Sequence, residues 1–453
     1  MIKSVLIANR GEIAIRIART ARRMGIKTYV VRTAKEPEAV YLSAADAVIN
    51  FPETDGNIPE FLDIDRLVGL AREYKIDSLH PGYGYLSENA ELAERCRDNG
   101  IVFIGPSPEV IRLMGDKVAA KGIAAQSGVP MLGASQGAVH TLDEARKIAK
   151  RLGYPVIIKA VSGGGGRGMR IVHHQDELEQ LYKIATAEAQ VAFNDPSVFI
   201  EKYLENPKHI EFQIVADNYG NVVHLGEREC SIQRKHQKLM EEAPSPALDE
   251  RLRKKMAAAA VSLAKQAGYQ SLGTVEFLLD HQKHFYFMEM NTRIQVEHPV
   301  TEFVTGVDLV QEQIRIAAGE KLRYRQRDIQ IKGHAIECRI NAEDPYRFIP
   351  SPGRITTLHQ PGGPGVRVDS HVYPGYFIPP HYDSMIGKLI TYGDTRDQAI
   401  ARMRTALSET VIEGISTNIP LHREMMIDQK FLQGGVSIHY LEEKLAHRES
   451  VKK

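Results

Sequence analysis

Glycines gather beside a lysine and two arginines in the stretch KAVSGGGGRGMR, residues 159–170. Glycine lets backbone N–H groups approach a phosphate closely, and lysine supplies the opposite charge. The run Gly163–Gly168 matches the G-x-G-x-x-G pattern of dinucleotide-binding loops, but MRIV follows where that motif requires a helix. Met169 stands where a Walker loop requires lysine, and neither H-R-D nor D-F-G of protein kinases occurs. The pattern predicts a hairpin, which either closes its N–H groups and Lys159 over nucleotide phosphates or is only a flexible loop.

Two glutamates lie in the stretch GTVEFLLDHQKHFYFMEMNTRIQVEHP, residues 273–299. Two apolar-rich strands are predicted around a four-residue turn, His281–His284, and counting back places Glu276 opposite Glu289, with Asn291 on the same face. Carboxylates about 5 Å apart repel by roughly 3 kcal/mol at an effective dielectric near 20. A divalent cation removes that repulsion, and Mg²⁺ on nucleotide phosphates is the usual one. No lysine alternates with these glutamates, which favours metal binding over a solvated face with salt bridges.

The next segment, RIQVEH, alternates a cation, an amide and a carboxylate. In an extended segment Arg293, Gln295 and Glu297 share one face. Beside a metal–nucleotide site they suit a small anionic substrate and the base that acts on it. A structural salt bridge from Arg293 to Glu297 is the alternative interpretation.

A third cluster, GERECSIQRKHQKLMEEAPSP, spans residues 226–246. It concentrates hydrogen-bond donors before a proline-rich turn: Gln233, Arg234, His236 and Lys238. Such a run is ordinarily a charged surface loop, and it gains a functional meaning only if it faces the glycine hairpin. Cys230 within it is interpreted as a small core residue.

The elements that position these residues belong to a chain of 453 residues, long enough for about three domains. The 58 basic and 57 acidic residues nearly cancel, which argues against a nucleic-acid or membrane-surface protein. Cys96, Cys230 and Cys338 lie far apart and fit a reducing compartment. The N-terminus shows no signal-peptide pattern, and no apolar run approaches a membrane span. We therefore expect a soluble, cytoplasmic, globular protein.

Strands and helices alternate up to about residue 113, which predicts an open parallel sheet. Ligands of such sheets lie beyond the carboxyl ends of the strands, so HPGYGYLSEN (80–89) is either a binding loop or a plain glycine turn. A small α+β unit follows around the glycine block. Residues 208–300 are expected to form mostly antiparallel strands around a helix, and another α+β region follows residue 331.

The chain resembles the ATP-grasp superfamily and, within it, biotin carboxylase. The matching stretches include IANRGEIAIRI, HPGYGYLSEN, GGGGRGMR, QRKHQK, EMNTRIQVEHPVTE, GHAIECRINAEDP and HYDSMIGKLI, and together they cover essentially the whole chain. The resemblance implies an α/β and α+β multidomain fold. Its parts are a Rossmann-like domain (1–113), an ATP-grasp centre (114–330) with a mobile glycine-flap lid at about 132–205, and a C-terminal α+β domain (331–453).

The activity implied by this resemblance is ATP- and bicarbonate-dependent carboxylation of biotin, through carboxyphosphate, with Mg²⁺ or Mn²⁺ as cofactor. No A-M-K-M-like biotinylation site occurs, so the biotin is expected on a separate carrier protein. Carboxyltransferase subunits and a second copy of the chain are the other expected partners. The resemblance fits the stand-alone subunit of acetyl-CoA carboxylase or of two-subunit pyruvate carboxylase, and leaves the final carboxyl acceptor open.

The resemblance further implies roles for the matching residues. The residues that would contact ATP are Lys117, Lys159, Gly165, Gly166, Glu201, Lys202, Leu204, His209, Gln233, His236, Glu276 and Glu289. The metal ligands would be Glu276 and Glu289, with Asn291 beside them. Bicarbonate and biotin would be bound by Lys238, Arg293, Gln295, Val296 and Arg339. Within that set, Glu297 would be the base on bicarbonate, Lys238 would steady carboxyphosphate, and Arg339 would stabilise the ureido oxygen of biotin.

Two other functions share part of this pattern. Another ATP-grasp ligase, which joins a carboxylate to an amine, would share the hairpin and the metal site, but RIQVEHP and ECRINAEDP favour a bicarbonate site and a ureido-facing arginine. A non-catalytic, ATP-binding regulatory subunit would lack some of Glu276, Glu289, Glu297 and Arg339, and all are present.

Overall fold

The computed structural model describes residues 2–36, 38–51, 59–161, 169–193 and 195–451. The chain divides into two compact units: Met1–Val129, Lys208–Leu278 and Met288–Lys453 form the first, and Pro130–Pro207 with Leu279–Phe287 the second. The predicted domain boundaries at residues 113 and 330 stay a prediction. Within the described ranges, every helix is too short or too polar to span a membrane.

The N-terminal part of the first unit contains a parallel sheet, as predicted. Its five strands lie in the order β3-β2-β1-β4-β5. It forms because apolar runs such as Val5–Ile7 are buried on both faces, and α1 packs Ile13 and Ile17 against them. The strands are β1 (Ser4–Ile7), β2 (Lys27–Arg32), β3 (Ala47–Asn50), β4 (Ser78–His80) and β5 (Val102–Phe103). The helices are α1 (Gly11–Arg23), α2 (Val40–Ala44), α3 (Ile64–Glu73), α4 (Ala90–Asp98), α5 (Pro108–Gly115) and α6 (Lys117–Gln126).

The loops after β1 and β4 meet at the edge where parallel strands end. Asn9 donates hydrogen bonds of 2.8 Å from Nδ2 to the carbonyls of Pro81 and Tyr83. Gly11 has φ +67° at the start of α1, a left-handed conformation that glycine adopts without strain. These loops, including the predicted HPGYGYLSEN segment, therefore lie where open sheets bind ligands.

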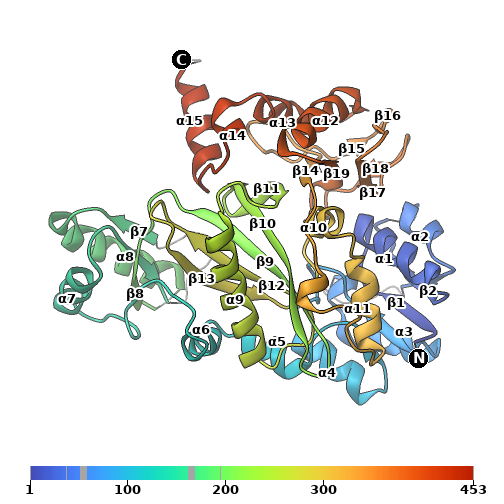
Figure 1. Ribbon diagram of the computed structural model, residues 1–453, viewed down its shortest axis with the longest axis horizontal. Helices are drawn as coiled ribbons and strands as arrows, with labels where there is room; N and C mark the ends of the chain where they lie inside the picture. Colours follow the sequence, from blue (N-terminus) through green and yellow to red (C-terminus); the bar gives the residue numbers. More distant parts are fainter. Residues whose placement is uncertain (1, 37, 52–58, 162–168, 194, 452–453) are drawn as a thin grey trace. The chain divides into compact units, whose positions relative to one another are not determined.

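An eight-stranded sheet forms the centre, in the order β13-β12-β9-β10-β11-β14-β19-β17. The pairings from β9 through β10, β11, β14 and β19 to β17 are antiparallel, as expected for the strands within residues 208–300. Alanine-rich α9 (Glu250–Gln266) packs closely on β9 and β10 (Figure 1). The strands are β9 (Lys208–Ala216), β10 (Val222–Arg234), β11 (Gln237–Ala243), β12 (Ser271–Leu279), β13 (Phe285–Asn291), β14 (His334–Asn341), β17 (Val366–Ser370) and β19 (Met385–Gly393). The helices α10 (His298–Thr305) and α11 (Leu309–Ala317) follow β13.

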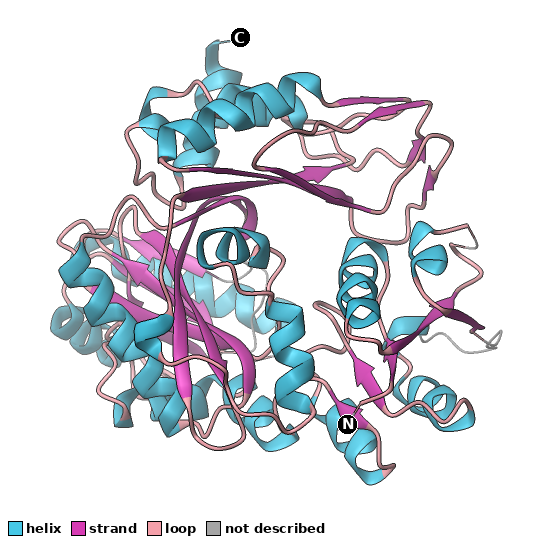
Figure 2. Cartoon of the chain, turned by 45° about the vertical axis from the view of Figure 1, so that its right-hand side comes forward, coloured by secondary structure: helices cyan, strands magenta, loops and turns pink. Residues whose placement is uncertain are grey.

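Helices of the C-terminal region cover one end of this sheet (Figure 2). The helices are α12 (Arg396–Glu409), α13 (Ile419–Met425), α14 (Gln429–Leu432) and α15 (Tyr440–Val451). The stretch RITTLHQ, residues 354–360, contributes to two short strands, β15 (Gly353–Arg354) and β16 (Thr357–His359), because its two parts pair with different partners. These short strands pair with β18 (Phe377–Ile378) and β20 (Val411–Glu413).

The second unit contains a three-stranded antiparallel sheet, β7-β6-β8. Its elements are α7 (Leu142–Leu152), β6 (Val156–Ala160), β7 (Met169–Val172), α8 (Leu178–Phe193) and β8 (Val198–Lys202). A strand rather than a helix therefore follows the glycine block, as predicted. The glycines at 163–166 and 168 lie outside the described residues.

A buried ion pair joins α1 to the central sheet. The fully buried Lys388 Nζ on β19 lies 3.0 Å from Glu12 Oε1 on α1 and donates to the Val296 carbonyl at 2.8 Å. Tyr83 donates a hydrogen bond to the same Glu12 oxygen. Burial alone would lower the pKa of Lys388, but the carboxylates of Glu12, Glu337 and Asp369 together outweigh it and raise that pKa, so the lysine stays charged.

The Lys388→Met substitution is expected to lower the free energy of unfolding by about 3–5 kcal/mol, because Glu12 is left buried without a counter-charge. Urea denaturation followed by circular dichroism measures the change. The double variant Lys388→Met/Glu12→Gln removes both charges and should recover at least half of the loss. A double variant as unstable as the single one would show that the ion pair is not the cause.

Candidate functional site

A cavity of about 970 Å³ opens in the first unit. Its walls come from the loops after β1 and β4, the β10–β11 hairpin, β12, β13 and the segment after it, and β14. Most of the predicted site residues of this unit line it: His209, Gln233, His236, Lys238, Glu276, Glu289, Asn291, Arg293, Gln295, Val296 and Arg339.

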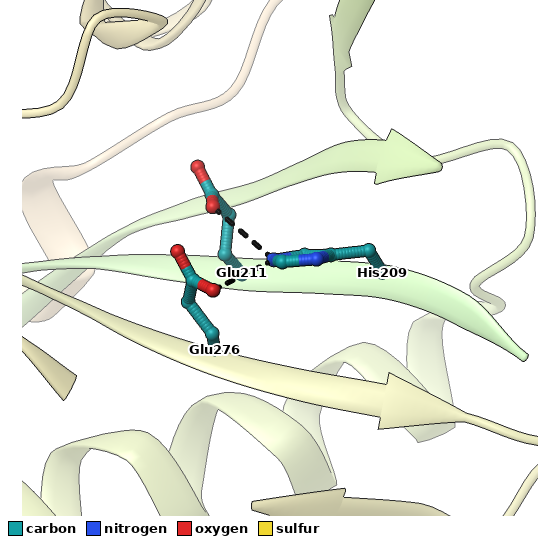
Figure 3. A group of neighbouring side chains, drawn as sticks. All are labelled: His209, Glu211 and Glu276. Atoms are coloured by element: carbon teal, nitrogen blue, oxygen red, sulfur yellow. Dashed lines mark ion pairs between the residues drawn. The ribbon is translucent and has the colours of Figure 1, made fainter. Parts of the chain in front are cut away.

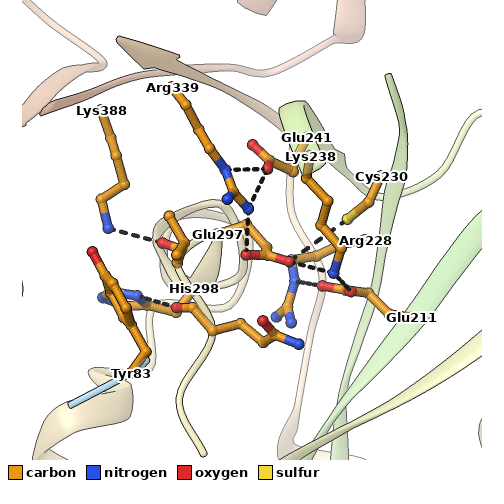
Figure 4. Close-up of polar contacts among 12 residues, drawn as sticks. Tyr83, Glu211, Arg228, Cys230, Lys238, Glu241, Glu297, His298, Arg339 and Lys388 are labelled. Atoms are coloured by element: carbon orange, nitrogen blue, oxygen red, sulfur yellow. Dashed lines mark hydrogen bonds and ion pairs between the residues drawn. The ribbon is translucent and has the colours of Figure 1, made fainter. Parts of the chain in front are cut away.

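Lys238 on β11 lies at the centre of the site's charges (Figure 4). Its Nζ is 2.6 Å from Glu211, 2.9 Å from Glu276 and 2.7 Å from Glu297. Burial alone would lower the pKa of this lysine, but the carboxylates outweigh it and raise the pKa well above its usual range. Lys238 is therefore a permanent cation.

Glu297 is fully buried at the residue that precedes α10. One carboxylate oxygen contacts Lys238, and the other lies 3.0 Å from Arg339 Nη2 (Figure 4). Burial raises the pKa of this carboxyl, but Lys238 and Arg339 outweigh it, so the pKa falls below its ordinary value. Glu297 is thus an ionised carboxylate next to the cavity, as a base must be.

Arg339 on β14 lies between two carboxylates. Besides Glu297, it contacts Glu241 on β11, which accepts a hydrogen bond of 2.7 Å from Arg339 Nε. The Arg339 carbonyl accepts hydrogen bonds from Asn418 at 2.9 Å and His422 at 2.8 Å, which fix the strand from behind. The guanidinium is therefore held in one orientation while it lines the cavity.

His209, Glu211 and Glu276 form a compact group on β9 and β12 (Figure 3). His209 Nε2 is 3.6 Å from Glu211 and 3.0 Å from Glu276. Burial would lower the pKa of His209, but the Glu276 and Glu211 carboxylates together outweigh it and raise the pKa to about 9, so the imidazole carries a proton at neutral pH. Glu211 also pairs with the buried Arg228 at 2.5 Å. The protonated imidazole and the two carboxylates thus form an ion-pair cluster at the cavity.

A second group, Glu211, Cys230 and Glu297, surrounds the space that Lys238 Nζ occupies. Burial raises the pKa of Cys230 well above its ordinary value, so it remains a thiol. The interpretation of Cys230 as a core residue agrees with this environment.

Glu276, Glu289 and Asn291 supply hard oxygen ligands at the cavity wall. Asn291 Nδ2 donates to Glu276 at 2.9 Å. Reduced contact with water and the Glu276 charge together raise the pKa of Glu289. Among the described residues, the Glu289 carboxylate accepts no hydrogen bond and forms no ion pair with any of them. Carboxylate and amide oxygens next to an unneutralised charge fit a divalent cation such as Mg²⁺.

The hairpin that carries these glutamates turns more tightly than predicted. Asp280 N–H donates to the His284 carbonyl at 2.9 Å, which leaves a turn of three residues instead of the expected His281–His284. Lys283 takes φ +66°, and the Asp280 carboxylate accepts from the amides of Gln282 and His284. These side-chain hydrogen bonds stabilise the shorter turn, which residue counting does not reveal.

The segment after the hairpin is not a simple extended face. Arg293 Nη1 donates to Gln295 at 2.9 Å, whereas its Nε pairs with Glu88 at 2.9 Å. The alternative salt bridge from Arg293 to Glu297 does not form, because Glu297, the residue before α10, pairs with Lys238 instead. The absence of a neighbouring lysine in the sequence was also misleading, since the fold brings Lys238 to Glu276.

The other predicted residues lie elsewhere. Lys117 is the exposed first residue of α6 and is not part of the cavity wall. Lys159, Glu201, Lys202 and Leu204 belong to the second unit, where Lys159 Nζ is 2.6 Å from Glu201 and Lys202 Nζ donates to the carbonyls of Gly153 and Tyr154. Gly165 and Gly166 lie outside the described residues.

Several residues of the site's ion pairs were not predicted: Glu12, Glu211, Arg228, Glu241 and Lys388. Tyr83 and Glu88 lie in the HPGYGYLSEN loop, which was predicted only as a whole. One signal could have found Glu211. His209, Glu211 and Gln213 alternate along β9, and three polar side chains at a period of two on a buried strand mark a polar face. The others come from separate parts of the chain and carry no local pattern.

Three family models match the chain: "Biotin carboxylase, N-terminal domain" over residues 1–111, "Carbamoyl-phosphate synthase L chain, ATP binding domain" over 116–325, and "Biotin carboxylase C-terminal domain" over 337–443. A biotin carboxylase of Haemophilus influenzae is 53% identical over 450 residues, which cover 99% of this chain and 100% of the relative. A chloroplastic biotin carboxylase of Arabidopsis thaliana is 51% identical over 451 residues, with 99% and 84% covered.

Solved structures agree with these matches. A biotin carboxylase from Campylobacter jejuni, in a beta-gamma-ATP complex, superposes with a TM-score of 0.91 at 46% identity, and the match covers 98% of this chain and 99% of that one. The biotin carboxylase domain dimer of Hydrogenobacter thermophilus 2-oxoglutarate carboxylase, with MgADP, ADP and bicarbonate, superposes with a TM-score of 0.89 at 49% identity, with 98% of each chain covered. The chain therefore belongs to the biotin carboxylase family.

Proposed function

We propose that this chain is an enzyme that carboxylates biotin on a separate carrier protein, with ATP and bicarbonate as co-substrates and ADP and phosphate as products. The observation that carries the proposal is Glu297, a buried, ionised carboxylate between Lys238 and Arg339 at a cavity with oxygen ligands for a metal. The names of the relatives and the bicarbonate and MgADP held by a solved relative support it.

In the proposed reaction, Glu297 removes the proton of bicarbonate, whose anionic oxygens Arg293, Gln295 and the Val296 backbone bind. The deprotonated oxygen forms a bond to the γ-phosphorus of ATP while the bond from that phosphorus to the ADP oxygen breaks. Lys238 neutralises the charge of the resulting carboxyphosphate. Phosphoryl transfer of this kind needs positioning and charge neutralisation rather than a covalent intermediate with the protein.

Arg339 is proposed to act in the second step. Once Glu297 has taken the proton of bicarbonate, it no longer attracts Arg339 as an anion, while Glu241 still holds the guanidinium through Nε. Arg339 then stabilises the negative charge on the ureido oxygen of biotin while the ring nitrogen bonds to the carboxyl carbon of carboxyphosphate. The bond from that carbon to the phosphate oxygen breaks, and the departing phosphate takes the proton of the ring nitrogen. Loss of the Glu297 charge in the first step thus makes Arg339 available for the second step.

The nucleotide and metal contacts complete the proposal. Glu276, Glu289 and Asn291 would hold Mg²⁺ or Mn²⁺, which supplies positive charge to the phosphates. The residues assigned to ATP are Lys117, Lys159, His209, Gln233, His236, Glu201, Lys202 and Leu204, with Gly165 and Gly166 in a mobile lid at about 132–205. The domain boundaries 1–113, 114–330 and 331–453 belong to the same proposal.

The proposed partners are a biotin carboxyl carrier protein, carboxyltransferase subunits and a second copy of the chain, in the cytoplasm. The family matches and the dimer of a solved relative support this assembly. The same subunit would serve acetyl-CoA carboxylase or a two-subunit pyruvate carboxylase, because the choice of carboxyl acceptor lies with the partner chains.

The decisive test is ADP release by the purified chain with ATP and Mg²⁺. The rate should increase with bicarbonate and with free biotin, and a metal chelator should abolish it. Glu297→Gln should lower the stimulated rate by about 100-fold or more, because a general base contributes that much. The matched control is Glu250→Gln, an exposed glutamate on α9, which should leave the rate unchanged. ATP turnover indifferent to bicarbonate and biotin would contradict the proposed function.

Arg339→Met should shift the pH dependence of bicarbonate-dependent ATP cleavage. Arg339 is one of the cations that lower the pKa of Glu297, and the base works only when ionised, so activity falls as pH drops through that pKa. Without Arg339 the pKa rises and the acid limb of the pH–rate profile moves to higher pH. Biotin stimulation should also fall at least about 10-fold. The exposed Arg354→Met is the control, and an unshifted acid limb in Arg339→Met would show that this ion pair does not tune the base.

A further inference from the structure

The turn between β10 and β11 takes a backbone conformation that its residues disfavour. Strand pairing joins Arg234 to Gln237, so the turn consists of Lys235 and His236 alone. Both have positive φ, +47° and +65°. A two-residue hairpin with φ > 0 at both positions ordinarily contains Asn-Gly, because a Cβ atom crowds the carbonyl in the left-handed region. The surroundings of the turn therefore impose this conformation.

The turn places side chains that line the cavity. His236 lies in the cavity wall, and the preceding strand pair, Gln233 with Lys238, lies there as well. The register shifts between Ile232 and Gln233, a β-bulge that re-aims the side chains next to the turn. Glycine would suit the backbone of residue 236 better but would supply no imidazole, which explains a strained residue at a functional site.

Helix α15 supplies one contact that holds the turn. The backbone N–H of Lys235 donates to Glu442 Oε1 at 3.0 Å. The neighbouring Leu441 is 1% exposed and belongs to the same hydrophobic core as Ile232 and Met240 of the hairpin. The packing of Leu441 thus fixes the backbone of α15 against the hairpin. The neighbouring Glu442 carboxylate is therefore held within hydrogen-bond distance of the turn.

A second contact comes from the loop after β14. The Arg234 guanidinium lies 4.0 Å from the centre of the Phe348 ring, a cation–π contact. Phe348 itself has φ +60°, and its N–H donates to the Asp344 carbonyl at 2.9 Å. The Asp344 carboxylate accepts from the amide of Arg347, which tightens this loop. Two separate parts of the C-terminal region therefore contact the hairpin turn: α15 at Lys235 and the loop after β14 at Arg234.

We infer that Glu442 is a positioning residue for nucleotide binding: its hydrogen bond to Lys235 keeps the strained turn in the left-handed conformation that presents His236 to the cavity. The nature of the ligand, a nucleotide phosphate, rests on the proposed function. Without Glu442 the turn relaxes part of the time, and only the fraction of molecules with the strained turn binds tightly. Apparent affinity then falls by that fraction, whereas turnover at saturating nucleotide does not change.

The test compares Glu442→Ala and Glu442→Gln with the unmodified full-length chain. Titration calorimetry with a non-hydrolysable ATP analogue and Mg²⁺ should show the dissociation constant raised about five-fold in Glu442→Ala, which corresponds to the roughly 1 kcal/mol of one net hydrogen bond. The KM for ATP should rise equally, with kcat and the KM for bicarbonate unchanged. Glu442→Gln keeps an oxygen acceptor and should restore the affinity to within two-fold of the unmodified chain, about the precision of such a comparison.

Two further variants separate positioning from a general effect. Glu443→Ala removes the same charge from the next residue of α15 and should leave nucleotide affinity unchanged. Lys235→Gly removes the Cβ atom that disfavours the turn, and in this background Glu442→Ala should change affinity less than two-fold, since glycine adopts positive φ unaided.

An unchanged dissociation constant in Glu442→Ala, an equal loss in Glu443→Ala, or an undiminished loss in the Lys235→Gly background would each overturn the inference. The proposed function fails separately, by ATP turnover that ignores bicarbonate and biotin. Calorimetry with the analogue measures the effect of Glu442 even in that case, because it requires no turnover.

Discussion

One ammonium group, the Nζ of Lys238, contacts three carboxylates, and the site depends on that contact. Glu211 comes from β9, Glu276 from β12 and Glu297 from the start of α10, so segments far apart in sequence meet at one atom. Carboxylates taken out of water are costly unless a cation and hydrogen bonds replace the lost hydration. The lysine therefore makes it possible to keep ionised glutamates next to an apolar core, where their chemistry is strongest.

The same requirement extends outward from the centre. Arg228 neutralises Glu211 from behind, His209 carries a proton opposite Glu276, and Arg339 pairs with Glu297. Arg228 and Arg339 are each held by further hydrogen bonds, so their charges are oriented before any substrate arrives. The exception is Glu289, whose carboxylate lacks a cation among the described residues, and that is where a metal ion fits.

Much of the fold could be predicted because local patterns specify it. Strand Lys27–Arg32 and helix Leu142–Leu152 follow from hydrophobic periodicity and from caps and glycines at their ends. Candidate site residues could be recognised because the polar residues of one motif lie only a few positions apart along the chain. The predicted length of the turn after Asp280 was wrong, because residue counting does not account for side-chain hydrogen bonds. Asp280 shortens its turn by accepting hydrogen bonds from the backbone amides of Gln282 and His284.

By itself the sequence determined the order of strands and helices, the absence of a helix after the glycine block, and the positions of the glutamates, since these depend on neighbours a few residues apart. Only the tertiary structure decided which charges pair. Lys238 neutralises Glu276 and Glu297, Glu88 rather than Glu297 pairs with Arg293, and the C-terminal helix supports the turn of His236. The physical reason is that electrostatic contacts and core packing act across space, between residues whose separation in sequence carries no periodic signal.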